Sequence, residues 1–284
     1  MPADIYATDD VQSCVVIWTP DLKFKSYFYP PWEDQHPQTA LYDVRLYKKE
    51  IYTCDLYRRK IQVFDQYYTL KREWYVYKQG DPIYWQPDSI SILKDEIYTA
   101  TWGHCKIMVF DLEGNFQREF GDIGYDPPFF QFCSGVAASG TRVYCSNFYM
   151  DRIQVYHTSG AYLFCWGETG DGAGQFLRPR HLAIAGGEIY VADYINSRIQ
   201  VFSLDGEFKR MWGEYGETQG KLKNPSGVAV ARGLVYVGGI YPRVLQSFTK
   251  NGVYQKSART WMGGCKGIDS PGQSNPHLPV MGMG

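Results

Sequence analysis

The chain has 284 residues, of which 44% are hydrophobic and 21% are charged. This composition is rich enough in apolar residues to form a sizeable core, so it excludes an intrinsically disordered chain. The 29 basic and 30 acidic residues give a net charge of -1, without the positive excess that is usual in proteins that bind long nucleic acids.

The N-terminal residues lack the basic start and apolar run of a secretory signal, and no apolar stretch approaches the roughly 18 residues that a membrane helix needs. The 7 cysteines include no Cys-x-x-Cys pair, so their spacing fits neither a disulfide framework nor a zinc ribbon. We therefore expect an intracellular, cytoplasmic protein with free thiols and no membrane insertion.

In chain order, the dipeptide Ile-Tyr or Val-Tyr recurs at a constant spacing of 46 residues. Its six copies begin at Ile5, Ile51, Ile97, Val143, Ile189 and Val235. The fifth copy lies in a unit of four predicted strands, at residues 182–185, 189–192, 198–202 and 208–212, with Asp205-Gly206 as a hairpin signal between the last two. Six such units predict an all-β, six-bladed β-propeller of four-stranded antiparallel blades.

The two ends of the chain are predicted to complete one blade together. The first copy starts at Ile5, which leaves no room for an innermost strand before it, whereas extra sequence follows the last copy. Asn275-Pro276 aligns with Asn224-Pro225 of the preceding unit, which predicts a closing strand at about residues 275–282. Residues 1–284 would then form a single propeller without open sheet edges. A chain that ends at Ser274 is accordingly expected to lose cooperative unfolding.

Three segments carry a resemblance to a known repeat. Residues 224–230 (NPSGVAV), 189–193 (IYVAD) and 198–202 (RIQVF) resemble the NHL repeat. The resemblance covers nearly the whole chain and is strongest from about residue 133 to 255. It implies an NHL-type propeller, and some proteins of this family bind single-stranded RNA on a positively charged face.

A carboxylate or amide and a basic residue five positions later recur in the units, as in Asp193 and Arg198. The pair could suggest catalysis, but both residues flank the loop between the second and third strands. A structural role is favoured there, because an Asp side chain stabilises a turn and a partner charge adds modest support.

The start of each innermost strand is predicted to place a polar residue at the mouth of the central channel. These channel-mouth residues are Asp88, Arg180, Ser226 and His277, with Cys133 or Ser134 in the fourth blade. His181 is one residue out of register and is expected to point to the other side of its strand.

A metal centre at the channel mouth is not expected. A propeller enzyme with similar blades, the amidating lyase of peptide hormone maturation, binds zinc through histidines at the matching positions, and only His277 fits that pattern here. Zinc needs at least three protein ligands. We therefore expect no metal, no cofactor and no catalytic residue, and keep a metal-dependent lyase or hydrolase as an alternative.

The inter-blade loops and the loops between second and third strands form the remaining candidate surface. Its aromatic residues, predicted to bind a partner, are Trp32, Trp85, Trp102, Tyr125, Phe130, Tyr149, Tyr194, Tyr215 and Tyr241. Exposed aromatic side chains are typical of protein contacts. We expect a non-enzymatic protein–protein interaction or scaffold propeller that binds protein partners in trans, within a multi-subunit assembly. Single-stranded RNA binding is the alternative, although acidic residues interrupt the basic ones on this surface.

Overall fold

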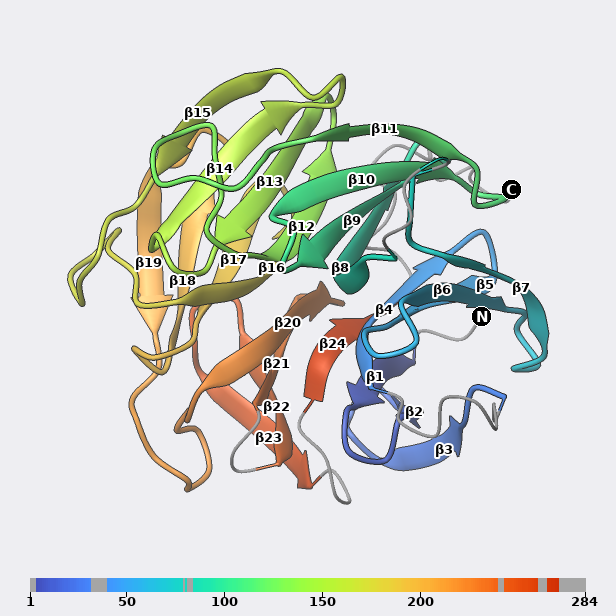
Figure 1. Ribbon diagram of the computed structural model, residues 1–284. Coiled ribbons are helices and arrows are strands. Elements are labelled where there is room, and N and C mark those ends of the chain that lie inside the picture. The colour runs from blue at the N-terminus through green and yellow to red at the C-terminus, as the bar shows by residue number, and fades with distance from the viewer. Residues whose placement is uncertain are drawn as a thin grey trace, which may run out of the picture.

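The computed structural model describes residues 4–31, 40–78, 80, 84–239, 243–259 and 265–270. In these ranges the strands form six four-stranded antiparallel sheets, arranged around a central channel (Figure 1). Neighbouring innermost strands contact one another around the whole ring. The predicted all-β, six-bladed propeller is confirmed.

Each blade places one strand at the channel and three strands progressively farther out. From the channel outward, blade 1 contains β24 (Cys265–Asp269), β1 (Ile5–Asp9), β2 (Cys14–Trp18) and β3 (Phe24–Phe28), and blade 2 contains β4 (Leu41–Tyr47), β5 (Glu50–Asp55), β6 (Lys60–Phe64) and β7 (Leu70–Tyr75). Blade 3 contains β8 (Gln86–Leu93), β9 (Glu96–Trp102), β10 (Lys106–Asp111) and β11 (Phe116–Phe120), and blade 4 contains β12 (Cys133–Ser139), β13 (Arg142–Asn147), β14 (Arg152–His157) and β15 (Tyr162–Trp166). Blade 5 contains β16 (Pro179–Ala185), β17 (Glu188–Asp193), β18 (Arg198–Ser203) and β19 (Phe208–Trp212), and blade 6 contains β20 (Pro225–Ala231), β21 (Leu234–Gly239), β22 (Val244–Thr249) and β23 (Tyr254–Arg259).

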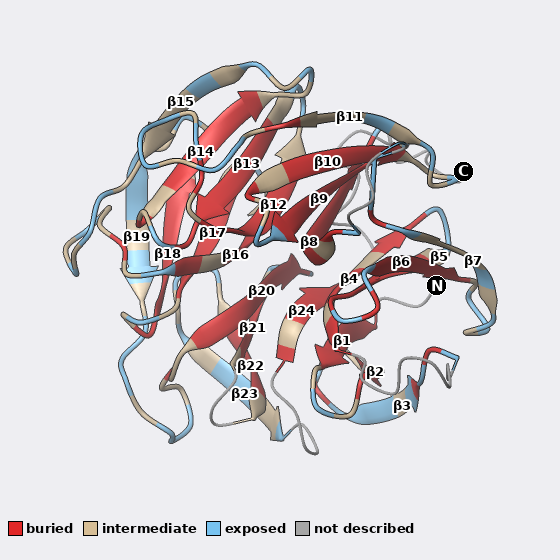
Figure 2. Ribbon diagram, viewed as in Figure 1, coloured by how far each residue is buried: buried red, intermediate tan, exposed pale blue. Residues whose placement is uncertain are grey.

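The core lies between the blades, and for this reason the repeated dipeptide is apolar on both residues. The second strand of a blade packs against a neighbouring blade on each face, so its residues are buried without the usual alternation (Figure 2). The tyrosines of the six dipeptides are all buried: Tyr6, Tyr52, Tyr98, Tyr144, Tyr190 and Tyr236. The outermost strands are the most exposed, which restricts the core to the interior of the ring.

An arginine on the outermost strand joins three pairs of consecutive blades. Arg118 donates two hydrogen bonds to Glu96, at 2.6 and 2.7 Å, and its Nε donates to the carbonyl oxygen of Thr158 in blade 4 at 3.0 Å. The hydroxyl of Tyr98 donates to the same carboxylate at 2.5 Å. Arg72 and Arg210 make the same contacts in blades 2 and 5. The sequence signal, which our sequence analysis missed, is a Glu directly before the dipeptide and an Arg 22 residues after that Glu.

The ring is closed by a strand from the C-terminal part of the chain, as predicted, but from a different segment. β24 pairs antiparallel with β1, and the backbone N–H of Gly267 donates to the hydroxyl of Thr8 at 2.9 Å. The predicted closing segment, residues 275–282, lies outside the described residues, and the innermost position is occupied by Cys265–Asp269. The prediction placed this strand too late in the chain.

The wrong placement came from aligning Asn275-Pro276 with Asn224-Pro225 of the preceding unit. Gly135 and Gly227 lie two units apart in the regular register, whereas Gly267 follows Gly227 after only 40 residues. The shared Cys-x-Gly pattern of residues 133–135 and 265–267 is the signal that identifies the strand. Glycine is needed because a Cβ atom at Gly267 would lie 2.4 Å from the Cα of Asp43 in the next blade.

Candidate functional site

Six side chains, one from each innermost strand, surround one mouth of the channel. They are Tyr42, Asp88, Ser134, Arg180, Ser226 and Lys266. The register of each innermost strand shifts at this position, as in a β-bulge. Bulges redirect side chains, and His181 therefore lines the same mouth beside Arg180. The expectation that His181 points away from the channel was wrong, because strict alternation does not hold across a bulge.

The structure brings three of the four predicted channel-mouth residues together: Asp88, Arg180 and Ser226. His277 lies outside the described residues. Lys266 provides the side chain of blade 1 at the mouth, because β24 and not a later segment closes the ring.

The channel mouth places one carboxylate between two cations. Burial raises the pKa of Asp88 to about 6, although Arg180 and Lys266 oppose the rise. The Lys266 ammonium lies 3.4 Å from the ring centroid of Tyr42 and 3.0 Å from a carboxylate oxygen of Asp10. Burial lowers the pKa of Lys266. Each of these charged groups is thus held in a partly dehydrated environment, where electrostatic contacts are stronger than in water.

A continuous row of aromatic rings borders this mouth on the side of blades 2 to 5. We call it the mouth belt, and its members are Tyr42, Trp102, Phe132, Phe148, Tyr149 and Tyr194. Ring centroids are 5.0 to 6.5 Å apart along the row from Tyr42 to Phe148 and from Phe148 to both Tyr149 and Tyr194, which is the range of favourable aromatic contacts. Tyr149 is 52% exposed, so the belt is open to solvent.

Two arginines lie over the mouth belt. The guanidinium of Arg178 is 5.6 Å from the ring centroids of Phe148 and Tyr149, and that of Arg180 is 5.4 and 5.0 Å from those of Phe148 and Tyr194. Within the described residues, neither guanidinium forms an ion pair, and the Nε of Arg180 is buried without a hydrogen-bond partner. Such oriented, unpaired guanidinium groups are suited to bind carboxylates.

The interior of the channel contains a second group of charged residues, from different blades. Asp43 accepts hydrogen bonds from Arg45 at 2.7 Å and from the hydroxyl of Ser89 at 2.9 Å. The Nη2 of Arg45 also lies 2.7 Å from the Nε2 of His181. Because arginine can only donate, this Nε2 is the acceptor in that contact, and it also lies 3.4 Å from a carboxylate oxygen of Asp43. Burial alone would raise the pKa of Asp43, but Arg45 outweighs it and lowers this pKa.

Asp269 lies next to this group, and burial raises its pKa to about 6 despite the charge of Arg45. We expect the Asp269→Asn variant to be more stable than the natural chain at pH 7.5. The pKa is higher in the folded state than the ordinary value of about 3.9, so the ionised form destabilises the fold and stability falls as the pH rises through 6. A shift of about two units corresponds to roughly 2–3 kcal/mol.

Urea unfolding at two pH values tests this expectation. The stability gain of Asp269→Asn should fall to less than half at pH 4.5, where the folded natural chain carries the neutral carboxyl. A variant that is destabilised equally at both pH values would contradict it.

Comparisons with known proteins agree with this fold. Residues 176–202 match the NHL repeat family. This segment of the propeller is thus similar to the NHL repeat. The chain is similar in fold to a chain from the crystal structure of a nidogen–laminin complex, with 12% identity, a TM-score of 0.72, and coverage of 94% of this chain and 98% of that one. It is also similar to a protein of unknown function from Bacteroides caccae, with 15% identity, a TM-score of 0.71, and coverage of 95% and 99%. No curated protein matches it.

The Asp193 and Arg198 pair connects two parts of blade 5. The Nε of Arg198 donates to Asp193 at 2.8 Å, and its Nη2 donates to the carbonyl oxygens of Gly172 and Gln175 at 2.9 and 2.8 Å. Asp193 is fully buried. The pair thus anchors the glycine-rich inter-blade loop to the blade, as expected of a structural role.

Four of the predicted partner-binding aromatics are exposed: Trp102, Tyr125, Tyr149 and Tyr215. Tyr194 is half-buried. Trp32 and Tyr241 lie outside the described residues. Of the exposed four, only Trp102 and Tyr149 belong to the mouth belt, which also includes Tyr42 and Phe132, two residues that were not predicted from the sequence.

Trp85 and Phe130 were wrongly predicted to face a partner. Trp85 is 5% exposed and stacks on the ring of His104, with 4.5 Å between centroids. Phe130 is fully buried and forms a bridge with Ile123, as Phe176 does with Thr169 one unit later. Both side chains anchor inter-blade loops to the core. They are therefore buried although they lie in loops.

Every cysteine of the chain is a free thiol, and six of the seven are buried. Burial raises the pKa of Cys14 to about 12 and that of Cys105 to about 11, which makes both thiols poor nucleophiles. Within the described ranges, no group of three His, Cys, Asp or Glu side chains is placed to bind a metal ion. The same part of the chain contains no helix long and apolar enough to cross a membrane.

Proposed function

We propose that this NHL propeller is a non-enzymatic protein-binding scaffold, whose mouth belt and overlying arginines receive an acidic segment of a partner protein. The observation that carries the proposal is the pair Arg178 and Arg180, each oriented by aromatic rings and without a carboxylate of its own among the described residues. Aromatic and arginine side chains together are the residue types that contribute most to protein interfaces.

A peptide carboxylate fits this site better than a nucleic-acid backbone. RNA binding needs an extended row of available cations, because each phosphate brings one charge. Two other cations on this face, Lys221 and Lys223, are paired with Glu214 and Glu217. Over the mouth belt itself, the cations without an ion pair among the described residues are Arg178 and Arg180, which suits a short acidic segment.

One further observation supports binding in trans within a larger assembly, and another indicates the compartment. The chain of similar fold in the nidogen–laminin structure comes from a complex between proteins. The free thiols suit a reducing compartment, so we place this interaction inside the cell, in the cytoplasm.

The double variant Arg178→Gln/Arg180→Gln is expected to bind a glutamate-rich peptide at least roughly tenfold more weakly than the natural chain, because each charge-assisted hydrogen bond contributes about 1.5–3 kcal/mol. Fluorescence anisotropy at two salt concentrations measures this loss. Lys221→Gln/Lys223→Gln is the matched control, since it removes the same charge from the same face and should leave binding nearly unchanged.

Affinity capture from the native source with both double variants extends the test to natural partners. Proteins retained by the control variant and lost from Arg178→Gln/Arg180→Gln would support the proposal. Loss of the same proteins from both double variants would contradict the proposal. Capture of proteins that nuclease treatment abolishes would also contradict it and would favour RNA binding.

A further inference from the structure

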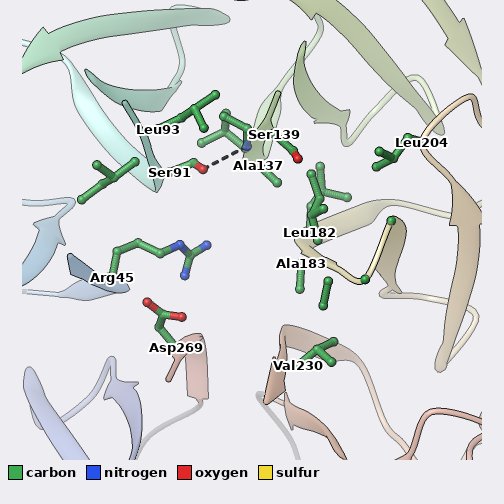
Figure 3. A pocket seen from close by; sticks show the side chains of 17 residues that line it. Arg45, Ser91, Leu93, Ala137, Ser139, Leu182, Ala183, Leu204, Val230 and Asp269 are labelled. Carbon is green, nitrogen blue, oxygen red and sulfur yellow. Dashed lines mark hydrogen bonds between the residues drawn. The ribbon is translucent and has the colours of Figure 1, made fainter. Parts of the chain in front are cut away.

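A larger cavity opens at the other end of the channel, where the innermost strands end. Its volume is about 460 Å³, and its lining comes from all six innermost strands, with no residue shared with the channel mouth (Figure 3). Small-molecule sites in proteins usually have volumes of about 300–1,000 Å³. The cavity is thus large enough for a small ligand.

The walls of the cavity are mostly apolar. Val136, Leu182 and Val230 contribute aliphatic side chains, while Ala137 and Ala183 are short and leave the space open (Figure 3). Such walls favour an apolar ligand body, because removing its surface from water is favourable.

The cavity also contains one carboxylate that lacks a full set of partners. The Oδ2 of Asp269 accepts a hydrogen bond from the backbone N–H of Leu46 at 2.7 Å, whereas its Oδ1 is buried without any hydrogen-bond partner. Asp269 is fully buried and lies beside Arg45 in the cavity lining (Figure 3). A buried polar atom without a partner is costly, and a ligand that donates a hydrogen bond to it would remove this cost.

The charges around Asp269 determine which donor is suitable. On β4, Arg45 forms an ion pair with Asp43 at 2.7 Å, so these two charges compensate each other. On β16, the Nε2 of His181 accepts a hydrogen bond from Arg45, so this nitrogen provides neither a donor nor a positive charge to Asp269. The ionised carboxylate of Asp269 therefore leaves one net negative charge in this buried group.

We propose that this cavity binds a small amphipathic amine, with its ammonium group on Asp269 and its apolar body between the aliphatic walls. The ammonium provides both the missing hydrogen-bond donor and the missing positive charge. A carboxylate ligand would instead face Asp269 with a like charge, and the nearby guanidinium of Arg45 already binds Asp43 and His181. Burial raises the pKa of Asp269 to about 6, so the carboxylate is ionised and available at pH 7.5. This site is independent of the mouth belt.

Isothermal titration calorimetry of the full chain at pH 7.5 with n-octylamine, n-octanol and octanoate tests the proposal, since these probes share a chain and differ in the head group. We expect octylamine to bind roughly ten- to a hundredfold more tightly than octanol, as a charge-assisted hydrogen bond implies. Octanoate should bind more weakly than both. Octanoate binding as tightly as octylamine would overturn the proposal.

Three variants locate the site. Asp269→Asn should reduce octylamine affinity to that of octanol, and Ala183→Leu should weaken all three probes by filling the cavity. Asp88→Asn is the matched control, because it removes a buried carboxylate with a similarly raised pKa from the other end of the channel, and it should leave octylamine binding unchanged. Octylamine affinity that survives Asp269→Asn in a folded protein would show that the amine binds elsewhere and would refute the assignment.

Discussion

A chain that ends at Gly264, and so lacks β24, is expected to lose the single cooperative unfolding transition or to associate with other copies. Without β24, the edge of β1 loses its hydrogen-bond partner, and the apolar core shared by blades 1 and 6 loses Cys265 and Ile268. An exposed strand edge beside an open core is a template for pairing between chains. Thermal unfolding followed by circular dichroism and light scattering measures both effects.

The matched control is a chain that ends at Ser274. It keeps β24, so we expect a melting temperature within a few degrees of that of the full chain. This reverses the expectation derived from the sequence, which placed the closing strand after Ser274. If the chain ending at Gly264 unfolded like the full chain and stayed monomeric, β24 would not be the closure of the ring.

The variant Arg45→Met is expected to lose about 3–5 kcal/mol of stability, because it leaves the buried carboxylate of Asp43 without its counter-ion. The Asp43 side chain is fully buried and receives hydrogen bonds from Ser89 and Ile90 of the next blade, so it cannot move into water. Urea denaturation at pH 7.5 gives the change in the free energy of unfolding.

Two controls separate the buried ion pair from a general effect of losing an arginine. Arg142→Met breaks the exposed pair with Asp205 and should cost about 1 kcal/mol or less. Asp43→Asn/Arg45→Met removes both charges and should recover a substantial part of the loss. If Arg45→Met lost no more unfolding free energy than Arg142→Met, the buried Asp43 carboxylate would not depend on Arg45 as its counter-ion.

The fold could be predicted because it is repeated. Each of the six dipeptides gives the same information, so one irregular unit does not alter the blade count. The closing strand has no such support: it occurs once, after a connection of irregular length, and the alignment of one Asn-Pro pair therefore placed it after Cys265–Asp269. Gly267, which cannot carry a side chain so close to Asp43, was a more reliable marker than the Asn-Pro pair.

The candidate site could be predicted only in part, because side-chain direction depends on details that periodicity does not describe. The structure places Asp88, Arg180 and Ser226 at the channel mouth, as expected. The bulge that lets the side chains of both Arg180 and His181 line this mouth has no clear sequence signal. The exposure of an aromatic residue in a loop could also not be predicted from that residue alone. Phe130 is buried because it anchors the loop between blades 3 and 4. Comparison with Phe176, the equivalent residue one unit later, would have indicated this burial.

The hydrogen bond between Arg45 and His181 connects the two ends of the central channel. Arg45 lines the cavity at one end and His181 lines the mouth at the other, so this 2.7 Å contact joins the linings of the two sites. If a ligand in the cavity turned Arg45 away from His181, the imidazole would lose its hydrogen-bond donor. The channel mouth would then respond to a ligand that it does not contact.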